Sequence, residues 1–158
     1  MNRPLTVGCV GLVFACASMG GLAEETGVVT SRTALAVGQE ASSSVLDGVF
    51  TSAQARRGGQ LYNQNCVSCH GTDFKGDEMA PSIAGNDFIV FWTEVPVGSL
   101  FERIKVSIPA DDPGRLSAEE STDVLAYLLD ASSYPSGESA LPADKAALDQ
   151  IMIVAPAE

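Results

Sequence analysis

Two cysteines and a histidine stand together in the pentapeptide Cys66-Val67-Ser68-Cys69-His70. Thiols three positions apart can each add to a vinyl group of one porphyrin, and the imidazole that follows directly can coordinate the porphyrin iron from one side. The pentapeptide therefore predicts one covalently bound haem c, with Cys66 and Cys69 as its attachment points and His70 as the proximal iron ligand. Because His70 is the only histidine of the chain, a second imidazole cannot come from the same molecule.

Two other chemistries share the Cys-x-x-Cys spacing. A structural zinc ion needs four ligands, and Cys66, Cys69 and His70 exhaust the soft ones outside the first 23 residues. A thiol–disulfide site places its cysteine pair at the start of a helix in a βαβ unit, whereas here a predicted helix ends at the pair. Haem attachment is therefore the favoured interpretation.

Residues 1–23 have the layout of a secretory signal peptide. Arg3 supplies a positive charge, residues 5–17 form an uncharged apolar run, and residues 21–23 place small side chains before a cut ahead of Glu24. The run is shorter than the roughly 20 residues that span a bilayer. We therefore predict removal of this leader and a periplasmic location.

The leader also allows a second cleavage, because residues 13–16 (Val-Phe-Ala-Cys) approximate a lipoprotein box, although Phe14 fits it poorly. Lipidation at Cys16 would then anchor the chain to a membrane, and a leader retained as an anchor is the third alternative. With Cys9 and Cys16 in the leader, no cysteines beyond the pair of the pentapeptide remain to build a disulfide framework.

The composition is that of a single globular domain with an acidic surface. The chain has 158 residues, 46% of them hydrophobic, and 9 basic against 20 acidic side chains give a net charge of -11. Such a charge disfavours a nucleic-acid partner. It serves solubility outside the cytoplasm, or it steers the chain toward a basic patch on a redox protein.

The element that must position the pentapeptide is a helix over residues 53–65, capped by Thr51 or Ser52. Gly58-Gly59 in its middle predicts either a close crossing with another helix or a break. Residues 24–46, before this helix, carry no sustained period and are predicted to form a flexible arm. The folded domain is therefore expected to span residues 47–158.

Further short helices are expected after the pentapeptide. The clearest runs from the capping box Ser117-Ala118-Glu119-Glu120 to about Ala131. Another helix is predicted over residues 98–107, and a short apolar turn capped by Asn86 or Asp87 is predicted over residues 88–92. A C-terminal strap or short helix follows from about residue 135.

These segments, in this order, resemble the class I monohaem cytochromes c. The matching segments are residues 66–71 (CVSCHG), 80–85 (APSIAG), 100–104 (LFERI), 116–117 (LS) and 124–129 (VLAYLL). More narrowly, residues 50–58 and 108–117 resemble cytochrome c subunits that accept electrons from quinoprotein alcohol dehydrogenases. The resemblance covers roughly residues 47–153, and it implies an all-α cytochrome c fold of about three to five helices around one covalent haem.

The resemblance also implies roles for residues outside the pentapeptide. The carbonyl of Pro81 is expected to accept the Nδ1 proton of His70, which fixes the ring and raises its basicity. Trp92 and Arg103 are candidate partners of the haem propionates, with core packing and a solvated charge as their respective alternatives. The glycine pair is expected to cross the last helix near Tyr127.

The sixth iron ligand departs from the family pattern. The position at which the family carries its distal methionine is Ile108, and an isoleucine cannot bind iron. Met79 is a candidate distal ligand, although it precedes Pro81 on the expected proximal side. Met152, Lys105 and the N-terminus are further candidates, and an open or water-bound site is the remaining alternative.

We therefore predict a one-electron carrier between a dehydrogenase, for example a quinoprotein, and a respiratory acceptor such as a terminal oxidase chain. The alternative is a haem sensor or gas-binding cytochrome with an open distal site. A weak peroxidase is disfavoured because no distal histidine is present for acid–base work. The expected partners are redox proteins, without nucleic acid, and membrane contact is expected only with a lipid on Cys16.

Overall fold

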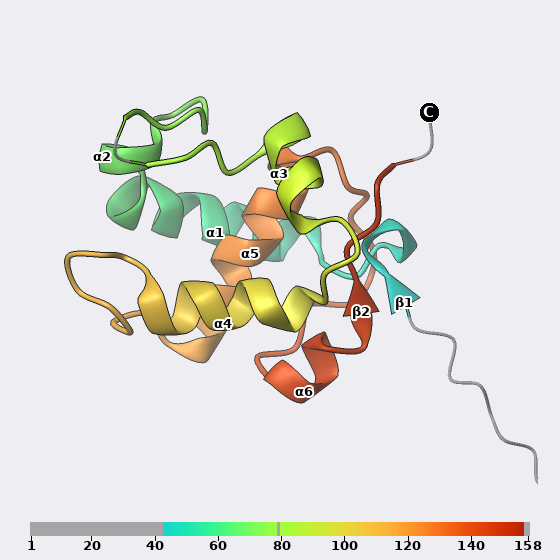
Figure 1. The fold of residues 1–158 in the computed structure, drawn as a ribbon. Helices are drawn as coiled ribbons and strands as arrows, with labels where there is room; N and C mark the ends of the chain where they lie inside the picture. Colours follow the sequence, from blue (N-terminus) through green and yellow to red (C-terminus); the bar gives the residue numbers. More distant parts are fainter. Residues whose placement is uncertain (1–42, 79, 157–158) are drawn as a thin grey trace, which may run out of the picture. The chain divides into compact units, whose positions relative to one another are not determined.

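The structure, a computed structural model, describes residues 43–78 and 80–156. In chain order its elements are β1 (Ser43–Ser44), the 3₁₀-helix η1 (Val45–Asp47), α1 (Ser52–Asn65), α2 (Val67–His70), α3 (Gly85–Trp92), α4 (Val97–Ser107), α5 (Ala118–Ala131), α6 (Lys145–Leu148) and β2 (Ile151–Met152), as Figure 1 shows. Helices dominate, and each of the two strands is two residues long. The predicted all-α fold class is confirmed.

Helix α1 begins one residue before its predicted start, and Thr51 is its cap. The Thr51 hydroxyl accepts a hydrogen bond from the backbone N–H of Gln54 over 3.1 Å. The helix is unbroken at Gly58, where a Cβ atom would lie 2.5 Å from the backbone carbonyl carbon of Asp123 and 2.9 Å from Cβ of Tyr127. Only a residue without a side chain permits this approach of α1 to α5, so the glycine pair marks the predicted crossing near Tyr127.

Helix α5 begins at the predicted capping box. The Ser117 hydroxyl accepts from the N–H of Glu120 over 3.1 Å, and the Glu120 carboxylate accepts from the N–H of Ser117 over 2.8 Å. Both bonds satisfy amide groups that the first helical turn leaves without partners.

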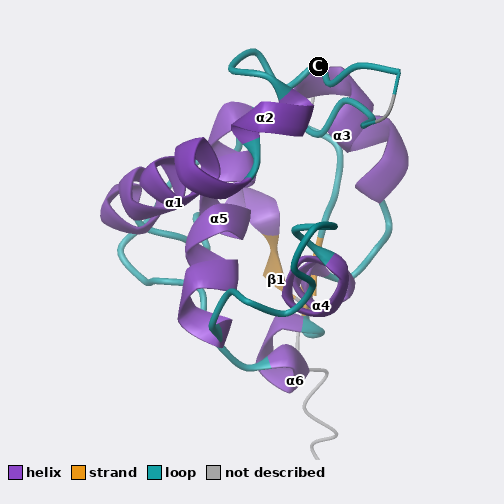
Figure 2. Cartoon of the chain, turned by 90° about the vertical axis from the view of Figure 1, so that its left-hand side faces the viewer, coloured by secondary structure: helices purple, strands orange, loops and turns teal. Residues whose placement is uncertain are grey.

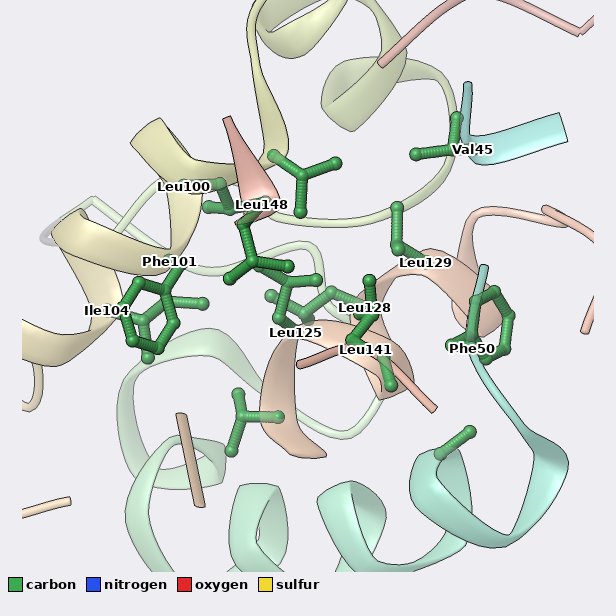
Figure 3. Packing of buried hydrophobic residues seen from close by; sticks show 14 of the residues in the cluster. Val45, Phe50, Leu100, Phe101, Ile104, Leu125, Leu128, Leu129, Leu141 and Leu148 are labelled. Carbon is green, nitrogen blue, oxygen red and sulfur yellow. The ribbon is translucent and has the colours of Figure 1, made fainter. Parts of the chain in front are cut away.

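The core lies where α5 meets α4 and the segments that precede α1. Figure 3 shows Leu125, Leu128 and Leu129 of α5 between the α4 side chains and Phe50. Leu125 and Leu129 are fully buried. Each large aliphatic side chain buried in this way stabilises the fold by about 1.5–3 kcal/mol. This packing fixes α4 and α5 as the framework on which the rest of the chain is arranged.

Helix α3 is longer than predicted and lacks the expected cap. It begins at Gly85, with Ala84 in the cap position, and neither Asn86 nor Asp87 caps it. The first N–H, that of Gly85, instead donates to the Ser132 hydroxyl over 3.1 Å. Ser132 follows α5 directly, so a residue distant in sequence supplies the hydrogen-bond acceptor that a local cap would otherwise provide.

Residues 43–46, which were predicted to belong to a flexible arm, take part in the fold. Ser43 and Ser44 pair in parallel with Ile151 and Met152, and the Val45 side chain is 0% exposed. Residues 43–46 are therefore part of the domain and not of a flexible arm, because strand pairing with the end of the chain holds them. The predicted leader, the rest of the predicted arm and Cys16 lie outside the described residues.

The segment after α5 wraps back over the domain. The buried Gln54 side chain donates to the carbonyl of Leu141 over 3.1 Å and accepts from its N–H over 2.8 Å. The Tyr134 hydroxyl donates to the carbonyl of Val154 over 3.0 Å. Within residues 43–78 and 80–156, no helix has the length and apolar character needed to cross a membrane.

Candidate haem-binding site

The pentapeptide forms a single tight turn at the end of α1. The N–H groups of Cys69 and His70 both donate to the carbonyl of Cys66, over 3.1 and 2.9 Å. The Cys66 N–H still belongs to α1, because it donates to the carbonyl of Tyr62. The turn therefore continues directly from the last turn of α1, and Cys66 and Cys69 form no disulfide with each other.

Both cysteines and His70 lie on the wall of a cavity of about 900 Å³. Most of its other walls are apolar and come from the segment before α3, from α3, α4 and α5, and from the loop that follows α4. These apolar lining residues are Ile83, Phe88, Trp92, Leu100, Ile104, Ile108, Leu116, Val124 and Leu128. The volume is at the upper end of the range for pockets that enclose a sizeable organic ligand.

The cavity lies between α2 and the loop that follows α4. Both segments line it, and both views show them well apart, with α2 on one side and the loop on the other (Figures 1 and 2). A flat ligand attached at Cys66 and Cys69 would thus have α2 at one face. The loop with Ile108 would lie at its other face.

The His70 ring is oriented for metal binding. Its Nδ1 lies 2.9 Å from the carbonyl oxygen of Pro81, which can only accept, so Nδ1 carries the proton. The other ring nitrogen, Nε2, then keeps its lone pair for a metal. Two free thiols, an imidazole with an available nitrogen and an apolar cavity together fit an iron porphyrin linked by thioether bonds.

Burial controls the chemistry of the groups around the turn. It raises the pKa of the Cys66 thiol to about 11, against a smaller lowering by the guanidinium of Arg115. Burial likewise raises the pKa of Tyr62 to about 12, and the Tyr62 hydroxyl donates to the carbonyl of Gly71 over 2.7 Å. Tyr62 packs against Phe74 and Tyr127, with ring centroids 4.9 and 5.5 Å apart. This aromatic cluster fixes the chain that leaves the pentapeptide.

Two of the predicted outer residues, Trp92 and Arg103, line the same cavity as the pentapeptide. Both also border a second hollow of about 300 Å³, which Phe91 and Pro81 share. The structure thus brings both residues to the site. Their contact with haem propionates stays a prediction.

The candidates for the sixth ligand are not brought together. Ile108 lies on the cavity wall, whereas Met152 pairs with Ser44 in the short sheet and is not a lining residue. The Lys105 ammonium donates to the carbonyl of Gly114 over 3.3 Å and also does not line the cavity. Met79 lies outside the described residues.

Sequence reasoning missed Arg115. This residue lines the cavity, its guanidinium donates to the Asn65 side-chain oxygen over 2.6 Å, and it lies 3.9 Å from the Asp111 carboxylate. It offers a second cation beside Arg103 for an anionic ligand. The sequence did offer one signal, because Arg115 is a cation between the turn after Ile108 and the capping box that begins at Ser117.

Residues 53–128 match the family described as cytochrome C oxidase, cbb3-type, subunit III. A cytochrome bc1 complex cytochrome c subunit of Mycobacterium bovis is 33% identical over 115 residues, which cover 72% of this chain and 36% of the relative. The corresponding subunits of two Mycobacterium tuberculosis strains give the same values. The chain thus spans about a third of the length of the curated relatives it matches.

Among solved structures, the sulfane dehydrogenase SoxCD from Paracoccus pantotrophus is similar with a TM-score of 0.41 and 22% identity. The match covers 59% of this chain and 52% of that one.

A helical domain with a Cys-x-x-Cys-His turn on the wall of an apolar cavity is typical of proteins that attach haem covalently. The chain belongs to the cytochrome c family, as the sequence match and the curated relatives show. Membership confirms the predicted class and the covalent haem c.

Proposed function

We propose that this chain is a periplasmic carrier that takes one electron at a time from a dehydrogenase, for example a quinoprotein, and passes it to a respiratory acceptor. The observation that carries the proposal is the turn of Cys66, Cys69 and His70 on the wall of an apolar cavity, with His70 Nδ1 bound to the carbonyl of Pro81. When bound, the haem supplies the reversible one-electron chemistry of its iron.

The residues of the chain have three tasks in this function. Cys66 and Cys69 bind the edge of the porphyrin covalently, so the haem does not dissociate while an electron passes to a partner protein. His70 is held at one angle by Pro81, which keeps the iron ligand the same in both oxidation states. The apolar walls from α4 and α5 exclude water, so that little solvent has to reorganise when the charge changes.

The propionates of the haem would meet a cation. Arg103 lines the cavity, and its guanidinium group is suited to bind a carboxylate through two parallel hydrogen bonds. Neutralising a propionate lowers the cost of placing a carboxylate against an apolar cavity. Arg103 would thereby help to set the reduction potential.

Charge and relatives support the proposed partners. With a net charge of -11, the chain would be drawn to a partner that presents a basic patch, and transfer would slow as salt screens this attraction. The mycobacterial relatives carry the name of a respiratory complex subunit, which supports a respiratory acceptor. The leader-like residues 1–23 support export.

The test is production of the full chain in bacteria that attach haem c in the periplasm. We expect one haem that stays with the polypeptide in denaturing gels, reversible one-electron reduction, and reduction by a quinoprotein dehydrogenase that slows with rising salt. The C66A/C69A variant should lose covalent haem, while S68A, at a neighbouring position on the cavity wall, should retain it. Failure of the wild-type chain to hold haem would refute the proposal.

A further inference from the structure

The cavity wall across from α2 contains a continuous apolar stripe. Leu100 and Ile104 lie four residues apart on α4, Ile108 follows four residues later, and all three line the cavity. This spacing places Leu100 and Ile104 on one face of α4, and Ile108 stands at the end of the helix in extended conformation. Pro109, next along the same wall, has no backbone N–H to offer. The cavity wall is therefore apolar where these four residues line it.

Side chains that could bind iron on this wall are scarce within the described part of the chain. No methionine or lysine from residues 43–78 and 80–156 lines the cavity, and the lining cysteines and histidine all belong to the pentapeptide. The carboxylate of Asp111 lies 3.9 Å from the guanidinium of Arg115, and its side chain is 77% exposed. Asp111 is thus at the mouth of the cavity and engaged there.

The chain around Met79 is held on the side of His70. The N–H of Asp77 donates to the carbonyl of Ala80 over 2.9 Å, and the Asp77 carboxylate accepts from the N–H of Ala80 over 3.0 Å. Pro81 follows directly and binds His70. Met79 itself lies outside the described residues, so the experiment below includes its substitution.

We propose that the sixth coordination position of the haem faces Ile108 and binds a small neutral diatomic molecule of the carbon monoxide, nitric oxide or dioxygen class. Carbon monoxide, the probe used below, would donate an electron pair to the ferrous iron in one coordinate bond, and this binding needs no oxidant or reductant. The apolar part of the wall formed by Leu100, Ile104, Ile108 and Pro109 suits a neutral ligand better than an anion. The proposal rests on the haem attachment proposed above and adds a binding site to it.

The experiment is a titration of the dithionite-reduced, haem-loaded protein with carbon monoxide, followed by visible absorption. We expect saturable binding by the wild type and equal binding by M79L. I108M should bind carbon monoxide at least about tenfold more weakly, because a sulfur ligand or its bulk competes for the same position. V106M is the matched control: Val106 lies two residues earlier, and it is 61% exposed and absent from the cavity wall.

Three results would overturn the proposal. Wild-type protein that shows no spectral change with carbon monoxide has its sixth position filled. Carbon monoxide binding by M79L but not by the wild type would assign the sixth position to Met79. Affinities of both I108M and I108F that equal that of V106M would show that Ile108 does not face the iron. Covalent haem and reversible reduction are measured on the same samples, so a reducible protein inert to carbon monoxide contradicts this inference and leaves the carrier function standing.

Discussion

Replacing Gly58 by alanine tests the helix crossing that supports the site. A Cβ atom at this position would meet the backbone of α5, 2.5 Å from the carbonyl carbon of Asp123 and closer still to its oxygen. A backbone carbonyl group cannot move away by a side-chain rotation, as the end of a side chain can. To restore ordinary contact, α1 and α5 would have to separate by about 1 Å, since carbon atoms pack at about 3.5–4.0 Å.

The cost of this separation follows from the packing of α5. A gap of 0.5–1 Å forfeits about a quarter to a half of the dispersion energy of the atoms that face it. Overpacking of a tight core costs about 1–3 kcal/mol or more, against a gain of about 1 kcal/mol in helix propensity when alanine replaces glycine. Because the clash is with backbone, the upper end of this cost applies, and we expect G58A to lower the free energy of unfolding by about 2 kcal/mol, which is about 8 °C in Tm for a domain of this size.

Gly59 provides the matched control. Its added Cβ atom would lie 3.1 Å from the Tyr127 ring, whose tip can shift, so G59A should stay within about 1 kcal/mol of wild type. Guanidinium unfolding of the haem-loaded variants, followed by far-UV circular dichroism, measures both values. Equal stabilities of G58A and G59A would refute the crossing geometry.

Three further predictions concern the framework around the site. Q54L should cost about 2–4 kcal/mol, because it leaves the buried N–H and C=O of Leu141 without partners, and limited proteolysis should then cut the segment after residue 135 first. S117A should cost about 1 kcal/mol through loss of the α5 cap, which the same unfolding assay measures. Tyr62 should leave the free energy of unfolding unchanged below pH 10 and lower it as the pH rises toward 12. The reason is that unfolded tyrosine loses its proton near pH 10, whereas buried Tyr62 keeps its proton to about pH 12. Y62F should flatten this part of the pH profile, and an unchanged slope would contradict the assignment.

Local signals in the sequence were sufficient for most of the helical framework. Thr51 and the Ser117–Glu120 box make the capping bonds that their residue types predict, since both partners lie within four residues. The start of α3 was predicted wrongly for the opposite reason. Its first N–H is satisfied by Ser132, at the end of another helix, and no local pattern records such a partner.

Residues 43–46 were assigned to the arm for the same physical reason, because their partners are distant in the sequence. Val45 stands in a stretch without hydrophobic period, and its burial depends on the pairing of Ser43 and Ser44 with the end of the chain. Arg115 was missed because it contacts Asn65, which lies 50 residues earlier, and the cavity wall. No local pattern in the sequence records such contacts.

The two faces of the iron differ in how much of their chemistry the sequence carries. The proximal face is local: one helical turn holds both thiols and the imidazole, so the spacing alone predicts attachment and the first ligand. The distal face depends on a loop more than 35 residues further along, from which Ile108 and several other residues line the cavity. Substitutions in the turn should therefore act on whether haem is held at all. Substitutions at Ile108 should act on what the iron binds and on its potential while leaving attachment intact, so one scaffold can serve as an electron carrier or as a ligand-binding site through a single residue.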